Sequence, residues 1–231
     1  MKVTEQPVTL VLPPPDQPRG VGVHLSGIIR CIATEQKILK PEWAEELSLS
    51  DVREITDPVA ILRINIGLAW EKHYIPMLSD VVDHPGEMRQ DGIFMTHDGE
   101  SVSVIFTDQP DTLYQVCHEV KATYKSTNTV CSPKMEMDIA LSANWMWLAQ
   151  MKGYCKGIGT RFAMLHVLFL CGDYTFPIKP VLRRWLIEFE QEEIDQNWEL
   201  MVDYMHHRLA IEQEEREQAA LITDDQWRYK Q

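Results

Sequence analysis

Long apolar runs and paired cysteines are both missing from this sequence. No uninterrupted apolar stretch approaches the about 20 residues that a membrane-spanning helix requires. The N-terminal residues also lack the basic-then-apolar form of a secretory signal, since Lys2 is followed by Glu5. The five cysteines are widely spaced and never form a C-x-x-C pair, which argues against a zinc or disulfide framework. We therefore expect a cytoplasmic protein with reduced thiols.

Positive charge is also scarce. The chain holds 22 lysines and arginines against 35 acidic residues, a net charge of −13, which at first sight argues against nucleic acid as a partner. The distribution weakens that objection, because residues 188–225 hold 13 acidic and 2 basic side chains. Residues 121–184 instead hold 9 basic and 3 acidic side chains. The acidity therefore belongs mainly to a C-terminal segment, and a basic region precedes it.

The remaining composition is that of an ordinary globular protein. At 231 residues, with 45% apolar and 25% charged residues, the chain suits one domain with elaborations. Prolines dominate residues 1–22, which we interpret as an extended arm. We expect a compact domain over residues 23–178 and an acidic helical extension over residues 179–231.

Helix signals occur at four places before residue 160. Residues 24–33 suit a short helix capped by Ser26, and residues 41–47 a further helical turn. Asp57-Pro58 is a typical helix start, and that helix is expected to run to about Leu78. Ser132-Pro133 repeats the signal and predicts a long helix to about Lys156, ended by the glycines at 157 and 159.

Strand signals fill most of the space between these helices. Residues 87–95, 101–106 and 113–121 predict three strands in a meander, with Asp98-Gly99 as a tight hairpin turn. Residues 161–171 form an apolar run suited to a strand buried on both faces, followed by a short partner strand near 174–178. Residues 179–218 predict one or two amphipathic helices whose apolar stripe must be buried on the core or on another chain.

Three charged residues are predicted to cluster on the meander. Glu119 and Lys121 share one face of the third strand, while Val120 points to the other, and Asp91 lies on a neighbouring strand. Hydrolysis of a phosphodiester needs a nucleophile at an anionic centre, and hard cations with carboxylate and carbonyl ligands provide this. The constellation is therefore interpreted as a metal-dependent phosphodiesterase centre.

The order of these elements and motifs resembles the PD-(D/E)XK nuclease superfamily, in its RecB-like and lambda-exonuclease-like branches. The similarity covers about residues 24–175, and the positions that carry it are Gly67-x-x-x-Glu71, Asp91, Glu119-Val120-Lys121 and Gln150-x-x-x-Tyr154. It implies an α/β (α+β) fold with a restriction-endonuclease-like αβββαβ core, a small mixed sheet flanked by helices. The long acidic helix at the C-terminus lies outside the similarity.

The resemblance also implies roles for these residues. It implies a DNA nuclease that depends on Mg²⁺ or Mn²⁺, with Asp91, Glu119, the Val120 carbonyl and Glu71 as metal ligands. Lys121 would contact the attacking water or the scissile phosphate. Gln150-x-x-x-Tyr154 marks the exonuclease branch and would border the site and help to hold DNA. Such enzymes serve DNA recombination, repair or phage DNA processing in phages and bacteria.

The sequence departs from the family pattern at several points. Gln90 replaces the proline before the first acid, and Trp70 stands where RecB-like members often have a histidine. Related nucleases that hold an iron–sulfur cluster have three C-terminal cysteines, whereas no cysteine follows Cys171 here, so we expect no such cluster.

Simpler interpretations remain open. Asp91 precedes a glycine and could be a turn residue, and the histidines, which include His118 and His166, are expected to be structural. Trp145 and Trp147 cannot both face inward on a helix, so one of them could stack on a base or a partner. Two functions compete with an exonuclease: a non-catalytic subunit of nuclease fold, and a structure-specific or restriction-type endonuclease. A homo-oligomer or a protein partner bound through the C-terminal helix is also expected.

Overall fold

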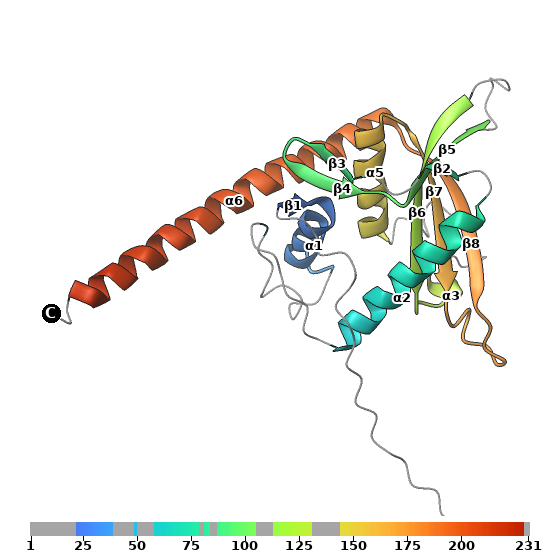
Figure 1. Cartoon of the computed structure of the whole chain (residues 1–231), viewed down its shortest axis with the longest axis horizontal. Coiled ribbons are helices and arrows are strands. Elements are labelled where there is room, and N and C mark those ends of the chain that lie inside the picture. The colour runs from blue at the N-terminus through green and yellow to red at the C-terminus, as the bar shows by residue number, and fades with distance from the viewer. Residues whose placement is uncertain are drawn as a thin grey trace, which may run out of the picture.

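The computed structural model describes residues 22–38, 49, 58–78, 81–83, 87–104, 113–130 and 144–228. Within these ranges the strands form one sheet of five strands and one of three, packed with helices (Figure 1). The expected proline arm up to residue 21, the helical turn at 41–47, Asp57 and Ser132-Pro133 lie outside the described residues. Among the described helices, none is long and apolar enough to cross a membrane.

The five-stranded sheet has the order β2-β5-β6-β7-β8. Its strands are β2 (Val81–Asp83), β5 (Gly99–Val104), β6 (Leu113–Thr123), β7 (Phe162–Phe169) and β8 (Val181–Glu188). Only β6 and β7, among these described strands, run parallel, and helix α5 (Trp145–Ile158) lies between them in the sequence. A parallel pair needs such a crossover because a short turn cannot return the chain to the same end of the sheet.

Helices pack on both faces of β6. Helix α2 (Pro58–Tyr74) continues into a 3₁₀ turn, η2 (Ile75–Met77), and Tyr74 and Ile75 pack on Val120. Cys117 lies on the opposite face of β6, in the main core with residues of α5 such as Met151 and Cys155. The order α2-β2-β5-β6-α5-β7 therefore confirms the expected αβββαβ core with a small mixed sheet.

The second sheet has the order β1-β4-β3 and lies beside α5. It consists of β1 (Val23–His24), β4 (Ile93–Thr96) and β3 (Glu87–Gln90). The strand expected over residues 87–95 is thus interrupted, because Asp91 and Gly92 take φ values of +49° and +85° and turn β3 into β4. Two successive positive φ values are typical of a type I′ hairpin. The Asp-Gly hairpin is therefore at 91–92 and not at 98–99.

Helix α1 (Leu25–Glu35) lies in the main core next to α5 and α6. It begins two residues earlier than a cap at Ser26 would allow, and its N-cap residue, His24, makes no side-chain capping bond. Burial of its apolar face, which includes Leu25, Ile28 and Ile32, stabilises it instead. Helix α5 ends as expected at Gly159, whose φ of +80° is the left-handed cap conformation.

The segment after β7 differs most from expectation. Residues 181–188 form strand β8, where helix was predicted, and residues 174–178 form no strand. Trp185 and Ile187 alternate with more exposed neighbours and pack on the core, the period of two that a strand requires. The physical reason is the unpaired edge of β7, which β8 covers along its whole length from Phe162 to Phe169.

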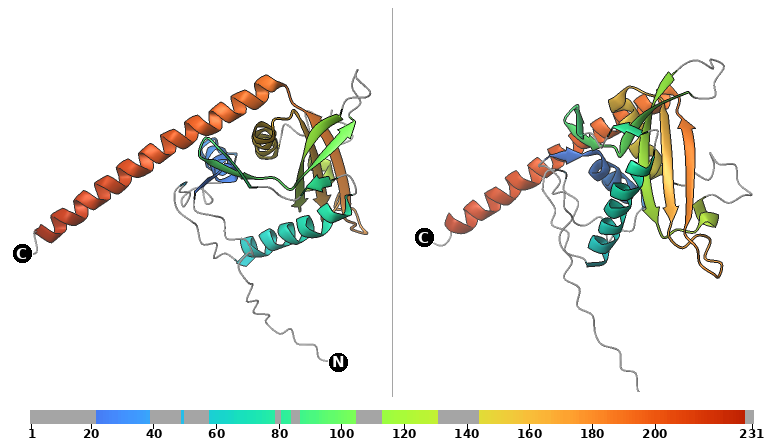
Figure 2. Two further views of the ribbon diagram at one scale, coloured as in Figure 1. Left: turned by 45° about the horizontal axis from the view of Figure 1, so that its top comes forward. Right: turned by 45° about the vertical axis from the view of Figure 1, so that its right-hand side comes forward.

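Helix α6 (Gln191–Arg228) is the expected long acidic helix. Its first half packs on α5 and α1 and buries Ile194, Trp198, Met201 and Met205. Its C-terminal part projects away from the other elements, as both views in Figure 2 show, and residues 213–219 are exposed.

Candidate active site between β6 and α5

Strand β6 places Glu119 and Lys121 on the face toward α5. The Glu119 carboxylate and the Lys121 ammonium form an ion pair, and their side chains are 2% and 23% exposed. The alternation of side chains along β6 accounts for their shared face, because residues two apart point the same way. Glu119 is thus buried against a cation that itself reaches solvent.

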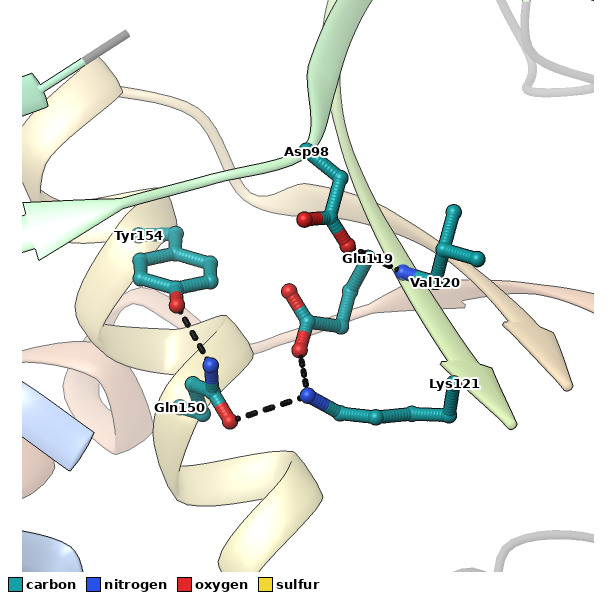
Figure 3. A network of polar contacts seen from close by, with 6 residues as sticks. All are labelled: Asp98, Glu119, Val120, Lys121, Gln150 and Tyr154. Atoms are coloured by element: carbon teal, nitrogen blue, oxygen red, sulfur yellow. Dashed lines mark hydrogen bonds and ion pairs between the residues drawn. The ribbon is translucent and has the colours of Figure 1, made fainter. Parts of the chain in front are cut away.

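Asp98, which the sequence analysis assigned to a turn, lies next to this pair. Its backbone N–H donates to the His118 carbonyl at 3.2 Å, and its Oδ2 accepts from the backbone N–H of Val120 at 2.5 Å. Both bonds follow from the pairing of β5 with β6, in which Gly99 lies opposite His118. The Asp98 carboxylate is therefore held next to Glu119 by the backbone of Val120 (Figure 3).

Asp91 is not part of this cluster, contrary to expectation. It lies in the β3–β4 turn of the other sheet, and its Oδ2 accepts a hydrogen bond from Trp198 Nε1 of α6 at 2.8 Å. Asp91 is therefore a turn residue, which was the simpler of the two interpretations. A signal for Asp98 was present in the sequence, because Asp98 is an acid directly before a strand that pairs with the first part of β6. It therefore lies next to the point where β6 continues into Glu119-Val120-Lys121.

Glu71 approaches the cluster from α2 and is partly buried. Burial, and then the negative charge of Glu119, raise its pKa to about 7, although Lys121 acts in the opposite direction. The pKa of Asp98 is raised well above its ordinary value by burial and by the charges of Glu119 and Glu71. Upward pKa shifts of this kind are expected where carboxylates are buried near other negative charges.

Helix α5 contributes Gln150 and Tyr154, which lie one turn apart and therefore on one face. Lys121 Nζ donates to Gln150 Oε1 at 3.2 Å, and Gln150 Nε2 donates to the Tyr154 hydroxyl at 2.5 Å (Figure 3). Tyr154 is buried, and burial together with the Glu119 charge raises its pKa well above the ordinary value. The structure thus brings both predicted α5 residues to the Glu119–Lys121 pair.

The electrostatics of the site favour a cation. Burial disfavours the Lys121 ammonium, but the charges of Glu119 and Asp98 outweigh this effect and raise the pKa of Lys121. Lys121 therefore keeps its proton at neutral pH, yet it faces three carboxylates with a single positive charge. Either protons on the carboxylates or a further cation can balance the remainder.

The donor atoms fit a hard divalent cation. Carboxylate oxygens of Asp98, Glu119 and Glu71 and the carbonyl of Val120 are the ligand type that Mg²⁺ and Mn²⁺ prefer. Within the described parts of the chain, however, no group of three or more His, Cys, Asp or Glu side chains is already arranged to hold a metal ion.

A chain of buried polar groups lies on the other face of β6, toward α2. Ser101 Oγ is 2.7 Å from His118 Nε2, His118 Nδ1 is 2.9 Å from His166 Nε2, and His166 Nδ1 is 2.9 Å from the Tyr74 hydroxyl. It joins β5, β6 and β7 to α2, the helix of Glu71. Both histidines have structural hydrogen-bond partners, in keeping with the structural role expected for them.

No protein-family model and no curated protein matches this sequence. Among solved structures, the chain is similar to an alkaline exonuclease from Laribacter hongkongensis, at 17% identity and a TM-score of 0.47, over 87% of this chain and 94% of that one. The same enzyme in complex with dAMP gives 16% identity and 0.48 over the same shares. A phage-related exonuclease from Haemophilus somnus gives 11% and 0.48 over 83% and 96%. Each is a similarity of chain path at low identity, and it assigns no activity to this chain.

Proposed function

We propose that this protein is a metal-dependent nuclease that hydrolyses phosphodiester bonds in DNA. One observation carries the proposal: Lys121 forms an ion pair with Glu119 in a partly buried site, where the charges of two further carboxylates, Asp98 and Glu71, also act on its ammonium. Such an excess of buried negative charge is costly for a structural site, whereas it suits the binding of a divalent cation and its anionic substrate.

Lys121 acts as a cation in this proposal. Because its pKa is raised, the amine is protonated and can orient a phosphate oxygen or the attacking water, but it is a poor general base in the metal-free protein. Gln150 holds Nζ from one side and Glu119 from the other, and Tyr154 fixes the Gln150 amide. These contacts pre-orient the ammonium toward one position, which lowers the entropic cost of placing it during the reaction.

Asp98 and Glu119 would hold the metal, with Glu71 and the Val120 carbonyl completing its ligands. When bound, a Mg²⁺ or Mn²⁺ ion supplies Lewis-acid polarisation of the phosphate and a water of lowered pKa. Asp98 takes the role of metal ligand that was expected of Asp91. We assign no iron–sulfur cluster.

The preference for an exonuclease rests on the Gln150-x-x-x-Tyr154 resemblance. In that role the protein would take a DNA end into the site, as required in recombination, repair or phage DNA processing. A structure-specific or restriction-type endonuclease would use the same residues and differ in how it holds DNA.

The test uses end-labelled linear DNA and covalently closed circular DNA, each with Mg²⁺, with Mn²⁺ or with EDTA. We expect metal-dependent release of mononucleotides or short products from linear DNA only. Cleavage of the closed circles would show that the protein is an endonuclease and not an exonuclease. No cleavage of either substrate, with either metal, would overturn the catalytic proposal.

A non-catalytic DNA-binding subunit is the second candidate. The observation in its favour is the direct Glu119–Lys121 ion pair, which satisfies both charges without a metal. The two candidates differ in one measurement, since a scaffold would bind DNA in the same experiment without cutting it.

A further inference from the structure

Lys125 lies just beyond the end of β6, and α5 holds its side chain in place. Its Nζ donates to Asn144 Oδ1 at 2.9 Å and lies 5.2 Å from the centre of the Trp147 ring. A lysine over an indole face is attracted by the ring, and the amide gives it a fixed direction. Lys125 is nevertheless an exposed residue, so its ammonium remains within reach of a ligand.

Two further lysines, both on α5, have structural roles and serve as a comparison for Lys125. Lys152 also lies over an aromatic ring, 5.3 Å from the centre of Phe189, but its Nζ is 3.0 Å from the Glu193 carboxylate. Lys156 is 2.6 Å from Asp195. Both ion pairs connect α5 to α6, and in each the charge of the lysine is neutralised by a carboxylate.

Lys125 differs because the partners it has among the described residues are uncharged. Asn144 and Trp147 hold the amine without neutralising it, and partial burial alone lowers the pKa of Lys125. Its positive charge is therefore oriented and partly desolvated, and no carboxylate of the described chain compensates it. An external anion at this position would gain more than at a fully hydrated surface lysine.

The position of Lys125 relates it to the candidate active site. Lys121 bonds to Gln150, and four residues farther along the chain Lys125 bonds to Asn144, six residues before Gln150. The chain from Lys121 to Lys125 therefore runs antiparallel to α5. We call the line of contact from the first bond to the second the seam. Trp147 lies three residues before Gln150, on the same helix face. Six helical residues correspond to about 9 Å and four extended residues to at most about 13 Å along this seam.

We propose that Lys125, oriented by Trp147 and Asn144, binds a backbone phosphate of the DNA strand whose scissile phosphate lies at Lys121. The inference rests on the proposed nuclease function for the identity of the strand. A compact ammonium suits a phosphate oxygen better than a base edge, because its three donors carry no sequence information. The rise of a duplex strand is about 3.4 Å per nucleotide, so the separation along the seam places this phosphate roughly three to four nucleotides from the scissile one. In a more extended strand, fewer nucleotides would span the same separation.

The test measures DNA binding in a Lys121→Ala background with Mg²⁺, so that the metal ligands are kept and cleavage is suppressed. The probes are duplex oligonucleotides with one uncharged methylphosphonate placed at successive positions from each end. In the background protein, we expect one position a few nucleotides from an end at which the methylphosphonate weakens binding about 10-fold, the size of one charge-assisted contact.

Two Lys125 variants and one control complete the design. Lys125→Met keeps an apolar stem on Trp147 but removes the charge, and Lys125→Arg keeps the charge. With Lys125→Met, binding of unmodified DNA should fall about 10-fold, the methylphosphonate effect at that position should vanish, and the slope of log affinity against log salt should lessen by about 0.7–0.9. Lys125→Arg should keep most of the affinity. The control, Lys152→Met, removes a lysine from a similar ring but should leave both affinity and slope unchanged.

The outcomes separate this inference from the proposed function. If the wild-type protein cleaves DNA but Lys125→Met binds as Lys152→Met does, Lys125 contacts no phosphate and the inference is wrong, while the nuclease stands. If the wild-type protein never cleaves DNA but the position-specific loss depends on Lys125, the phosphate contact stands without the catalysis. A uniform loss at every methylphosphonate position would also overturn the inference, because it would reflect charge in general. Circular dichroism and thermal unfolding check that each variant is folded.

Discussion

The backbone N–H of Val120 donates a hydrogen bond to Oδ2 of Asp98, with 2.5 Å between the two atoms. Val120 lies between Glu119 and Lys121, and its side chain packs toward α2 on the other face of the sheet. The bond therefore holds the first acid of the site against the strand that supplies the second acid and the amine. It also distinguishes Asp98 from Asp91, which bonds to Trp198 instead.

Asp98→Asn should lower the cleavage rate by at least about 100-fold, because it removes a charged ligand from the site while keeping its shape. Asp91→Asn is the matched control, since it changes the same kind of side chain beside a glycine outside the cluster. We expect it to retain activity within a few-fold. Initial rates on labelled linear DNA measure both. Loss of activity in Asp91→Asn, with Asp98→Asn active, would reverse the two assignments.

Lys121→Ala should also reduce cleavage by at least about 100-fold, because it removes the ammonium that orients the reacting groups. The structure adds an effect on stability: Glu119 is almost fully buried and would lose its charged partner. We expect the free energy of unfolding to fall by about 3 kcal/mol, as when one member of a buried ion pair is removed. Urea unfolding in EDTA measures this loss. An unchanged midpoint would show that the pair contributes nothing to stability.

Glu71 predicts a pH dependence of stability in the absence of metal. Its folded-state pKa of about 7 lies above the ordinary value of 4.5, so between these values the folded protein binds more protons than the unfolded one. Stability from this group is present below pH 4.5 and is lost as the pH rises through 7. Asp98 shifts in the same direction.

Thermal unfolding in EDTA between pH 5 and pH 8 measures this effect. The midpoint should fall toward pH 8 in the wild type, and Glu71→Gln should flatten the fall. Added Mg²⁺ should raise the midpoint most at the higher pH, because the ion competes with protons for the carboxylates. A midpoint that rises with pH in the wild type, or a Glu71→Gln variant with the same profile, would contradict the coupling.

Tyr74→Phe tests the buried chain of polar groups that joins α2 to the sheet. The change removes the hydroxyl 2.9 Å from His166 Nδ1 and should lower the free energy of unfolding by about 1–2 kcal/mol. Tyr204→Phe is the control, because the Tyr204 hydroxyl bonds to Glu35 in an exposed pair, and there we expect a loss below about 0.5 kcal/mol. Urea unfolding of both variants supplies the comparison. Equal losses would mean that the His166 contact has no special contribution.

Truncation of α6 separates its two halves. Ending the chain after Ile194 removes Trp198, Met201 and Met205 from the core and should prevent stable folding. Ending it after Gln213 removes a segment that is exposed where its side chains are described, and the fold should persist.

Light scattering then tests the expectation that the outer half of α6 binds a second copy or a partner. The chain ending at Gln213 should show a lower mass per particle than the full chain at the same concentration. An equal mass would show that the outer half does not mediate self-association.

Local sequence determined the parts of the site that depend on short-range geometry. Glu119 and Lys121 share a face because a strand repeats every two residues, and Gln150 and Tyr154 share a face because a helix repeats every 3.6. Gly159 ends α5 because a left-handed cap favours glycine. None of these features needs a distant partner to be specified.

Tertiary structure decided the features for which the local signals are equivalent. Asp91-Gly92 and Asp98-Gly99 are the same dipeptide, and strand pairing alone makes the first a hairpin turn and places the second opposite His118. Residues 181–188 satisfy a short helical and a strand pattern alike, and the open edge of β7 selects the strand. The contact of Lys125 with Trp147 depends on how α5 crosses β6. In each case pairing or packing with another element provides the free-energy difference between alternatives that are locally equal.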